Sequence, residues 1–96
     1  MANPSDDPIV TQFRDQVGEI DLELIGLLNK RLSVVDRLWR YKAEHGIEMY
    51  DPEREQRMIA FLTEANTGPL SQEALREVYR TIVETTKAEA TRLGGS

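Results

Sequence analysis

The stretch RDQVGEIDLELIGLLNKRLSVVDRLWRYKAEHG, from Arg14 to Gly46, decides the fold of this chain. Its apolar residues recur at alternating steps of three and four, which is the spacing of an amphipathic α-helix. No proline interrupts the pattern before Pro52, and a glycine such as Gly46 is a common residue just past a helix C-terminus. The apolar series starts before this stretch and comprises Val10, Phe13, Val17, Ile20, Leu24, Leu27, Val34, Leu38 and Tyr41.

Helix-start signals divide the chain into three predicted helices. Asp7 and Asp51 each precede a proline, a pair that predicts an N-cap followed by proline in the first turn. Ser71 predicts a third N-cap. The sequence therefore predicts an all-α fold, with one very long helix and two shorter ones in a single domain over residues 1–96. The predicted helices cover about residues 7–45, 51–65 and 71–92.

Composition narrows the class of protein. The chain is 40% hydrophobic and 30% charged, with a net charge of −5, which argues against nucleic acid and anionic membranes as partners. It has no cysteine, which excludes disulfides and thiolate metal sites, and its single histidine argues against a histidine-rich metal site. We expect no metal and no cofactor. No apolar run is long enough to cross a bilayer, and the N-terminal residues do not resemble a secretory signal. We expect a cytoplasmic protein.

The length of the first helix predicts a dimer. A helix over residues 7–45 would be about 58 Å long, whereas a compact chain of this size has a radius of gyration of about 12–13 Å. Two shorter helices cannot cover an apolar stripe of that length, so we expect a second copy to cover it in an antiparallel homodimer. The alternative is a kink at Gly26 that folds the chain into a four-helix monomer.

Two cations lie on the apolar side of this helix. Arg31 takes the place of an apolar residue in the seven-residue series Val17, Leu24, Arg31, Leu38. Lys42 follows eleven residues later on the same face, about 16 Å away. A buried charge needs a partner. Two interpretations stay open here: Arg31 pairs with a carboxylate of the protein while Lys42 is a solvated helix-end lysine, or the two cations bind an anion.

Arg14 favours the bound anion. It lies about 25 Å from Arg31 along one helix, but in an antiparallel dimer Arg14 of one chain would approach Arg31 and Lys42 of its partner. Arg54, at the start of the second helix, could fold back over the same region. The planar fork of arginine suits carboxylates, so the expected ligand is a small dicarboxylate.

These residues resemble a known family. The chain resembles the AroQ-type, all-helical chorismate mutases in the motif YDPERE, in the segment GPLSQEALREVYRTIVE of the third helix, and overall from about residue 9 to residue 90. The resemblance implies an intertwined homodimer that rearranges chorismate to prephenate in the shikimate pathway, toward aromatic amino acids. The residues that carry the spacing are Arg14, Arg31, Lys42, Asp51, Arg54 and Glu55.

The resemblance also implies roles for the cations. Arg14 of the partner and Arg31 would bind the two substrate carboxylates. Lys42 would donate to the ether oxygen of the breaking bond and to a carboxylate. The reaction is a rearrangement within one molecule, so it requires no nucleophile, general base or metal. The protein needs only to hold the substrate folded and to stabilise negative charge on the ether oxygen.

Four further positions match the family's site, each with a simpler alternative. Asp51 and Glu55 would stand near the ring hydroxyl, although Asp51 is equally a helix cap and Glu55 equally a solvated residue. Arg54 would help to close the pocket, or is a surface arginine. Thr86 would lie near a carboxylate, or is a threonine at the edge of the core.

One position departs from the family. The residue four positions after Thr86 is usually Gln or Glu and donates to the ether oxygen, but here it is Ala90. Glu89 is adjacent, yet it points about 100° away on a regular helix. Either a shift in the third helix turns Glu89 inward, or the site lacks this donor, a loss worth roughly 10²–10³ in rate.

Several alternative functions therefore stay open. An isochorismate-pyruvate lyase shares the fold and the cation positions, and a 4-amino-4-deoxychorismate mutase could present its amine to Asp51 and Glu55. A non-catalytic helical dimerisation module explains the stripe but not the cations within it. A weakly active mutase that regulates, or depends on, another enzyme of the aromatic pathway would be consistent with Ala90.

Overall fold

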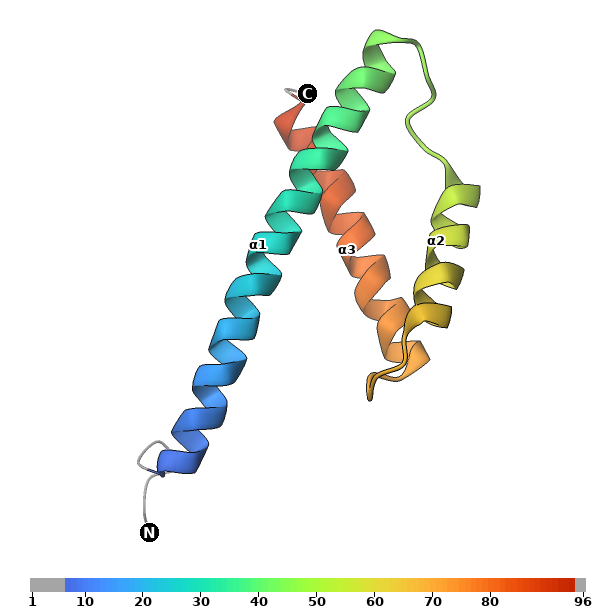
Figure 1. Ribbon diagram of the computed structural model, residues 1–96. Coiled ribbons are helices and arrows are strands. Elements are labelled where there is room, and N and C mark those ends of the chain that lie inside the picture. The colour runs from blue at the N-terminus through green and yellow to red at the C-terminus, as the bar shows by residue number, and fades with distance from the viewer. Residues whose placement is uncertain (1–6, 95–96) are drawn as a thin grey trace. The chain divides into compact units, whose positions relative to one another are not determined.

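The computed structural model describes residues 7–94 and contains within them three α-helices and no strand (Figure 1). The all-α class and the three helices predicted from the sequence are confirmed. The chain forms two compact units, residues 1–31 and 32–96. That the whole chain acts as one domain remains a prediction. The helices are α1 (Pro8–Glu44), α2 (Pro52–Ala65) and α3 (Gln72–Leu93).

All three helices start at the caps expected from the sequence. The carboxylate of Asp7 accepts hydrogen bonds from two backbone amides in the first turn of α1, at 2.8 and 3.3 Å. Asp51 accepts from the backbone amide of Arg54 at 3.1 Å, and Ser71 from that of Ala74 at 3.1 Å. Each cap satisfies an amide that has no partner within its own helix.

The long helix ends in a glycine turn. Gly46 has a φ of +64°, in the left-handed region that favours glycine. This conformation lets the amide of Ile47 return to the carbonyl oxygen of Lys42 at 2.8 Å, as in a Schellman motif. The turn starts the connector that leads to α2.

The first unit consists, over residues 7–31, of the N-terminal part of α1, and none of these residues is buried. Apart from the half-buried Val10, its large apolar side chains are 45–72% exposed. Leaving apolar surface in water costs about 25 cal/mol per Å². This face therefore favours a partner surface. The exposed side chains are Ile9, Phe13, Val17, Ile20, Leu22, Leu24, Ile25, Leu27 and Leu28.

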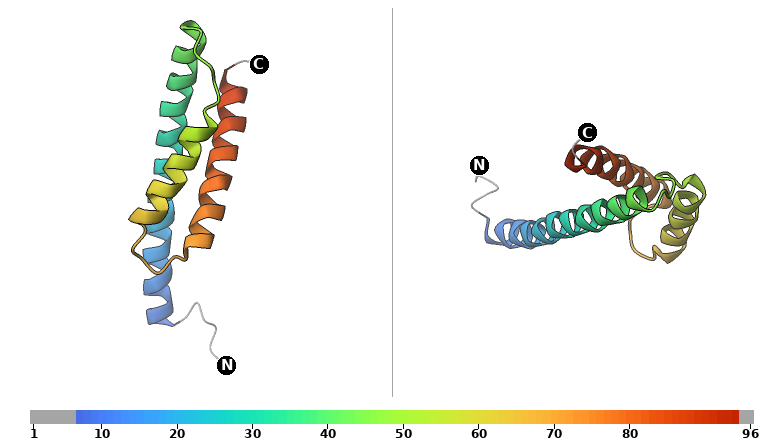
Figure 2. Two further views of the ribbon diagram at one scale, coloured as in Figure 1. Left: turned by 90° about the vertical axis from the view of Figure 1, so that its right-hand side faces the viewer. Right: turned by 90° about the horizontal axis from the view of Figure 1, so that it is seen from above.

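The second unit packs around α3. α2 and α3 converge toward the turn over residues 66–71 that joins them (Figures 1 and 2). Within residues 7–94, the buried side chains are Thr86 and Ala90, one turn apart on α3. The guanidinium of Arg40 donates to the carbonyl oxygen of Leu93 at 3.4 Å and so joins α1 to the end of α3. Among the described helices, none could span a membrane.

Candidate active site

Lys42 lies at the last turn of α1 and is half-buried. Its Nζ donates a hydrogen bond to the carbonyl oxygen of Met49 at 3.2 Å, so the connector folds back onto the lysine. An ammonium group carries three donors, so this bond leaves donor capacity for a ligand. Because Lys42 is half-buried and bonded to Met49, it is not the fully solvated helix-end lysine that the sequence also allowed.

The first turn of α2 carries three of the predicted site residues. Asp51 and Arg54 are exposed, and Glu55 is half-buried. Asp51 acts as the N-cap, with Oδ1 bonded to the amide of Arg54. The cap fixes the side chain of Asp51 at the start of α2, about one turn before Glu55.

Lys87 on α3 is a residue that the sequence did not single out. Its Nζ lies 2.8 Å from a carboxylate oxygen of Glu55 and 3.7 Å from one of Glu84. The same Nζ lies 5.5 Å from the centre of the Tyr50 ring, which meets Trp39 edge-on at 6.0 Å between centroids. The hydrogen bond to Glu55 raises the pKa of Lys87 above 10.5, although partial burial opposes the shift. Lys87 therefore joins α3 to the start of α2.

No sequence signal linked Lys87 to Glu55. The two residues belong to different helices and are separated by the 66–71 turn, so periodicity does not relate them. One sequence feature could have drawn attention to Lys87: it directly follows Thr86, which the resemblance to the family places near the site.

Thr86 and Ala90 face the interior of the second unit. The hydroxyl of Thr86 donates to the carbonyl oxygen of Ile82 at 2.7 Å. Ala90 is 2% exposed and lines a cavity of about 270 Å³. On α1 this cavity meets the side of Trp39 and Ala43, and Ala43 points about 100° away from Lys42. The cavity is lined by Asp36, Trp39, Arg40, Ala43, Met49, Ala90, Thr91 and Gly94.

Glu89 pairs with an arginine of its own helix. α3 is an uninterrupted α-helix through this position, so the shift that would turn Glu89 inward is not observed. The carboxylate of Glu89 instead accepts from the guanidinium of Arg92 at 2.6 Å. The Glu89 carboxylate is therefore engaged by Arg92, and Ala90 has no polar side-chain atom to donate.

Arg14 and Arg31 both lie in the first unit, on α1. Arg14 is exposed and Arg31 is half-buried. α1 is continuous between them, so the seventeen residues that separate them correspond to a rise of about 25 Å. One copy of the chain does not bring these two guanidinium groups to one small ligand.

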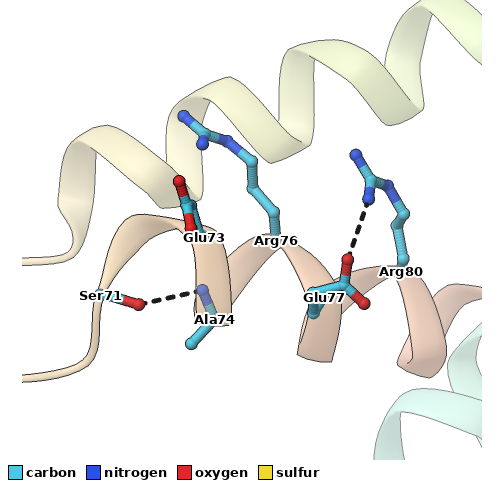
Figure 3. Close-up of a pocket in the computed structure, with 6 residues that line it drawn as sticks. All are labelled: Ser71, Glu73, Ala74, Arg76, Glu77 and Arg80. Carbon is cyan, nitrogen blue, oxygen red and sulfur yellow. Dashed lines mark hydrogen bonds and ion pairs between the residues drawn. The ribbon is translucent and has the colours of Figure 1, made fainter.

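A second hollow lies at the start of α3, away from the predicted site residues (Figure 3). Figure 3 shows the guanidinium groups of Arg76 and Arg80 extending from α3, with Arg80 paired to Glu77 at 3.5 Å. The hollow has a volume of about 560 Å³. Among residues 7–94, no group of His, Cys, Asp and Glu side chains is arranged to hold a metal ion.

The fold and these side chains define a class: a small all-helical protein whose cations lie along one long, partly uncovered helix and at the start of the next. The sequence profile described as chorismate mutase type II matches residues 13–91. The chain belongs to the type II, or AroQ-type, chorismate mutase family.

Named relatives agree with this assignment. The T-protein of Haemophilus influenzae is 33% identical over 83 residues, which cover 85% of this chain and 22% of that protein. The bifunctional chorismate mutase/prephenate dehydratase of Aquifex aeolicus is 30% identical over 76 residues, which cover 75% of this chain and 21% of that protein. The chain thus spans about a fifth of the length of these curated relatives.

A solved structure matches more completely. The chorismate mutase (Form II) of Thermus thermophilus superposes with a TM-score of 0.82 at 31% identity. The match covers 86% of this chain and 94% of that chain. The three-helix arrangement is therefore shared with a protein of nearly the same extent.

Proposed function

We propose that this chain is a chorismate mutase, an isomerase that rearranges chorismate to prephenate in the biosynthesis of aromatic amino acids. The observation that carries the proposal is the match to the Thermus thermophilus chorismate mutase over 94% of that chain. Family membership over residues 13–91 supports the same activity. The half-buried Arg31 and Lys42 supply cations that a dianionic substrate requires.

The proposed chemistry is conformational restraint with electrostatic stabilisation. Arg31 and Arg14 of the second copy bind the two carboxylates, which holds the substrate with its reacting carbons close together. Lys42 donates to the ether oxygen, where negative charge grows as the carbon–oxygen bond breaks. The electron shift stays within the substrate, so no protein group gains or loses a proton.

The proposed site is shared between two copies in an antiparallel homodimer. The support is the exposed apolar face of α1 over residues 7–31, which a second copy of the same helix would cover. A two-fold axis also places the start of one α1 beside the later part of the other, so Arg14 crosses to the partner's site.

The remaining positions are proposed to select the substrate. Asp51 and Glu55 would accept hydrogen bonds from the ring hydroxyl, and Arg54 would close the pocket over it. Thr86 would lie near a carboxylate. The support is that Asp51, Arg54 and Glu55 occupy one turn of α2 and that Glu55 faces α3 through Lys87.

The test is a substrate comparison with purified protein. We expect the absorbance of chorismate to fall and prephenate to appear, without release of pyruvate from isochorismate. Pyruvate release would instead identify a lyase, and turnover of 4-amino-4-deoxychorismate alone would identify the amino analogue as the substrate. Absence of turnover with all three would leave the dimerisation module as the better description.

One observation favours a weaker enzyme that a partner activates. Ala90 stands where the family usually provides a donor, and the adjacent Glu89 pairs with Arg92 instead. A partner enzyme of the aromatic pathway would then raise the rate, which a titration of turnover against such an enzyme measures. The cytoplasmic location expected from the sequence remains a prediction.

A further inference from the structure

Lys87 on α3 and Glu55 on α2 form an ion pair between two helices. Their charged atoms lie 2.8 Å apart, and the side chain of Lys87 is 27% exposed, so solvent screens the pair only partly. The second carboxylate, Glu84, is more distant at 3.7 Å and lies on the same helix as the lysine. Glu55 is therefore the principal partner of Lys87.

The pair matters because of what the site has to bind. The proposed substrate carries two negative charges, and an uncompensated carboxylate at Glu55 would repel them. A carboxylate held against an ammonium group is close to neutral as a unit, yet its oxygens can still accept a hydrogen bond. A cation beside Glu55 thus lets the Glu55 carboxylate bind the ring hydroxyl of the substrate without repelling the substrate's negative charges.

The surroundings fix the geometry of this lysine. Nζ lies 5.5 Å from the centre of the Tyr50 ring, and Tyr50 in turn packs edge-on against Trp39. Tyr50 directly precedes the α2 cap, Asp51. The lysine stem and the ring therefore hold Nζ between α3 and the first turn of α2, where Glu55 lies.

We propose that Lys87 is a positioning residue of the active site, which fixes the Glu55 carboxylate and cancels its charge so that a dianion with a ring hydroxyl can bind. This inference rests on the proposed function. It assigns substrate selection partly to a cation on α3 that never contacts the substrate.

The experiment is a double-mutant cycle on chorismate turnover, using wild type, Lys87→Met, Glu55→Gln and the double variant. In Lys87→Met the uncompensated Glu55 should raise KM about tenfold with kcat within about threefold, because repulsion acts on binding. In the Glu55→Gln background the same substitution should change KM by less than about threefold, since no carboxylate remains to compensate. Lys87→Arg should keep KM near wild type.

The control is Arg80→Met, which removes a cation of α3 that pairs with Glu77 at 3.5 Å. This variant should leave KM and kcat unchanged. Circular dichroism checks that each variant folds, and Lys87→Gln replaces Lys87→Met if the latter does not.

The outcomes separate the two proposals. Wild-type protein that does not convert chorismate refutes the proposed function, and the inference with it. Active wild type together with an unchanged KM in Lys87→Met overturns the inference alone. An equal rise in KM in both Glu55 backgrounds also overturns it, because a merely structural lysine would act without regard to the charge at Glu55.

Discussion

The Nζ of Lys42 and the carbonyl oxygen of Met49 are joined by a hydrogen bond of 3.2 Å. This bond closes the connector against the last turn of α1, so the amine lies at the approach to α2 rather than in solvent. A lysine that must hold a charge near a reacting bond benefits from such a fixed partner, because less reorganisation is needed when the substrate binds.

Lys42→Met should therefore lower kcat by about 10²–10³, since it removes the donor proposed for the ether oxygen. The lost bond to Met49 should cost only about 1 kcal/mol of stability, so the variant should still fold. Chorismate turnover and urea unfolding measure the two effects separately. Lys30→Met, at an exposed lysine of the same helix, is the control and should behave as wild type. A Lys42→Met enzyme with wild-type kcat would contradict the assigned role.

The two caps offer a matched comparison at Asp51. Asp51→Ala and Ser71→Ala each remove an N-cap bond of 3.1 Å, so each should lower the free energy of unfolding by about 0.5–2 kcal/mol. Asp51→Ser should keep most of the stability, because serine also caps helices. If Asp51 contacts the ring hydroxyl, both Asp51 variants should lose activity on chorismate, whereas Ser71→Ala should not. Equal activity in Asp51→Ser and wild type would reduce Asp51 to a cap.

Sequence patterns predicted what depends on neighbours along the chain. The caps at Asp51 and Ser71 and the glycine turn at Gly46 follow from local backbone chemistry, and each occurs as predicted. The Lys87–Glu55 pair was not predicted, because it depends on how two helices face each other. The same holds for Lys42, whose partner is a backbone carbonyl in an irregular connector that carries no side-chain signal.

The family pattern identifies the position of Ala90 but does not predict which residues surround it. Spacing from Thr86 identified the position, but its surroundings depend on the packing of α3 against α1. Ala90 opens into a cavity beside Trp39, Ala43 and Met49. The carbonyl oxygen of Met49 accepts from Lys42 Nζ at 3.2 Å, so this cavity adjoins the connector that holds Lys42.

Ala90→Gln should consequently raise kcat by about tenfold or more, because it restores a donor at the position where the family pattern has Gln or Glu. A glutamine side chain grown from this position enters the cavity beside Trp39 and Met49, and the backbone of Met49 bonds Lys42. Placing an amide in this interior should cost about 1–3 kcal/mol of stability if it finds no partner. Chorismate kinetics and thermal unfolding of the purified variant test both statements. An unchanged kcat in Ala90→Gln would show instead that Ala90 does not border the substrate.

The charge of Lys87 should add to the free energy of unfolding at neutral pH, and this contribution should be lost in strong alkali. The hydrogen bond to Glu55, followed by the charges of Glu55, Glu84 and Tyr50, raises the pKa of Lys87 above 10.5, against the opposing effect of burial. A lysine whose pKa is raised on folding stabilises the protein fully below its unfolded pKa, and the contribution is lost as pH rises through the folded pKa. We expect wild type to exceed Lys87→Met by about 0.2–1 kcal/mol near pH 8.

That difference should shrink when urea unfolding is repeated above the pKa of the lysine. A difference that stays constant or grows in alkali would mean that packing of the lysine stem, and not its charge, provides the stability.

The shared site is tested by mixing inactive chains. Arg14→Ala and Arg31→Ala should each abolish turnover, because each removes a carboxylate ligand from every site, while circular dichroism and sedimentation should show a folded dimer. After unfolding and refolding together in equal amounts, half of the dimers should contain one chain of each kind. In such a dimer, intact Arg14 of one chain meets intact Arg31 of the other at one site, so about a quarter of wild-type activity should return.

A chain carrying both substitutions provides the opposite control. When it is refolded with wild type, each mixed dimer has one site without Arg14 and one without Arg31, so the activity per wild-type chain should fall by about half. A site built within one chain predicts the reverse of both results: no recovery from the two single variants, and undiminished activity per wild-type chain with the double variant. The two mixtures therefore decide whether Arg14 and Arg31 of one chain serve the same active site or two different active sites of the dimer.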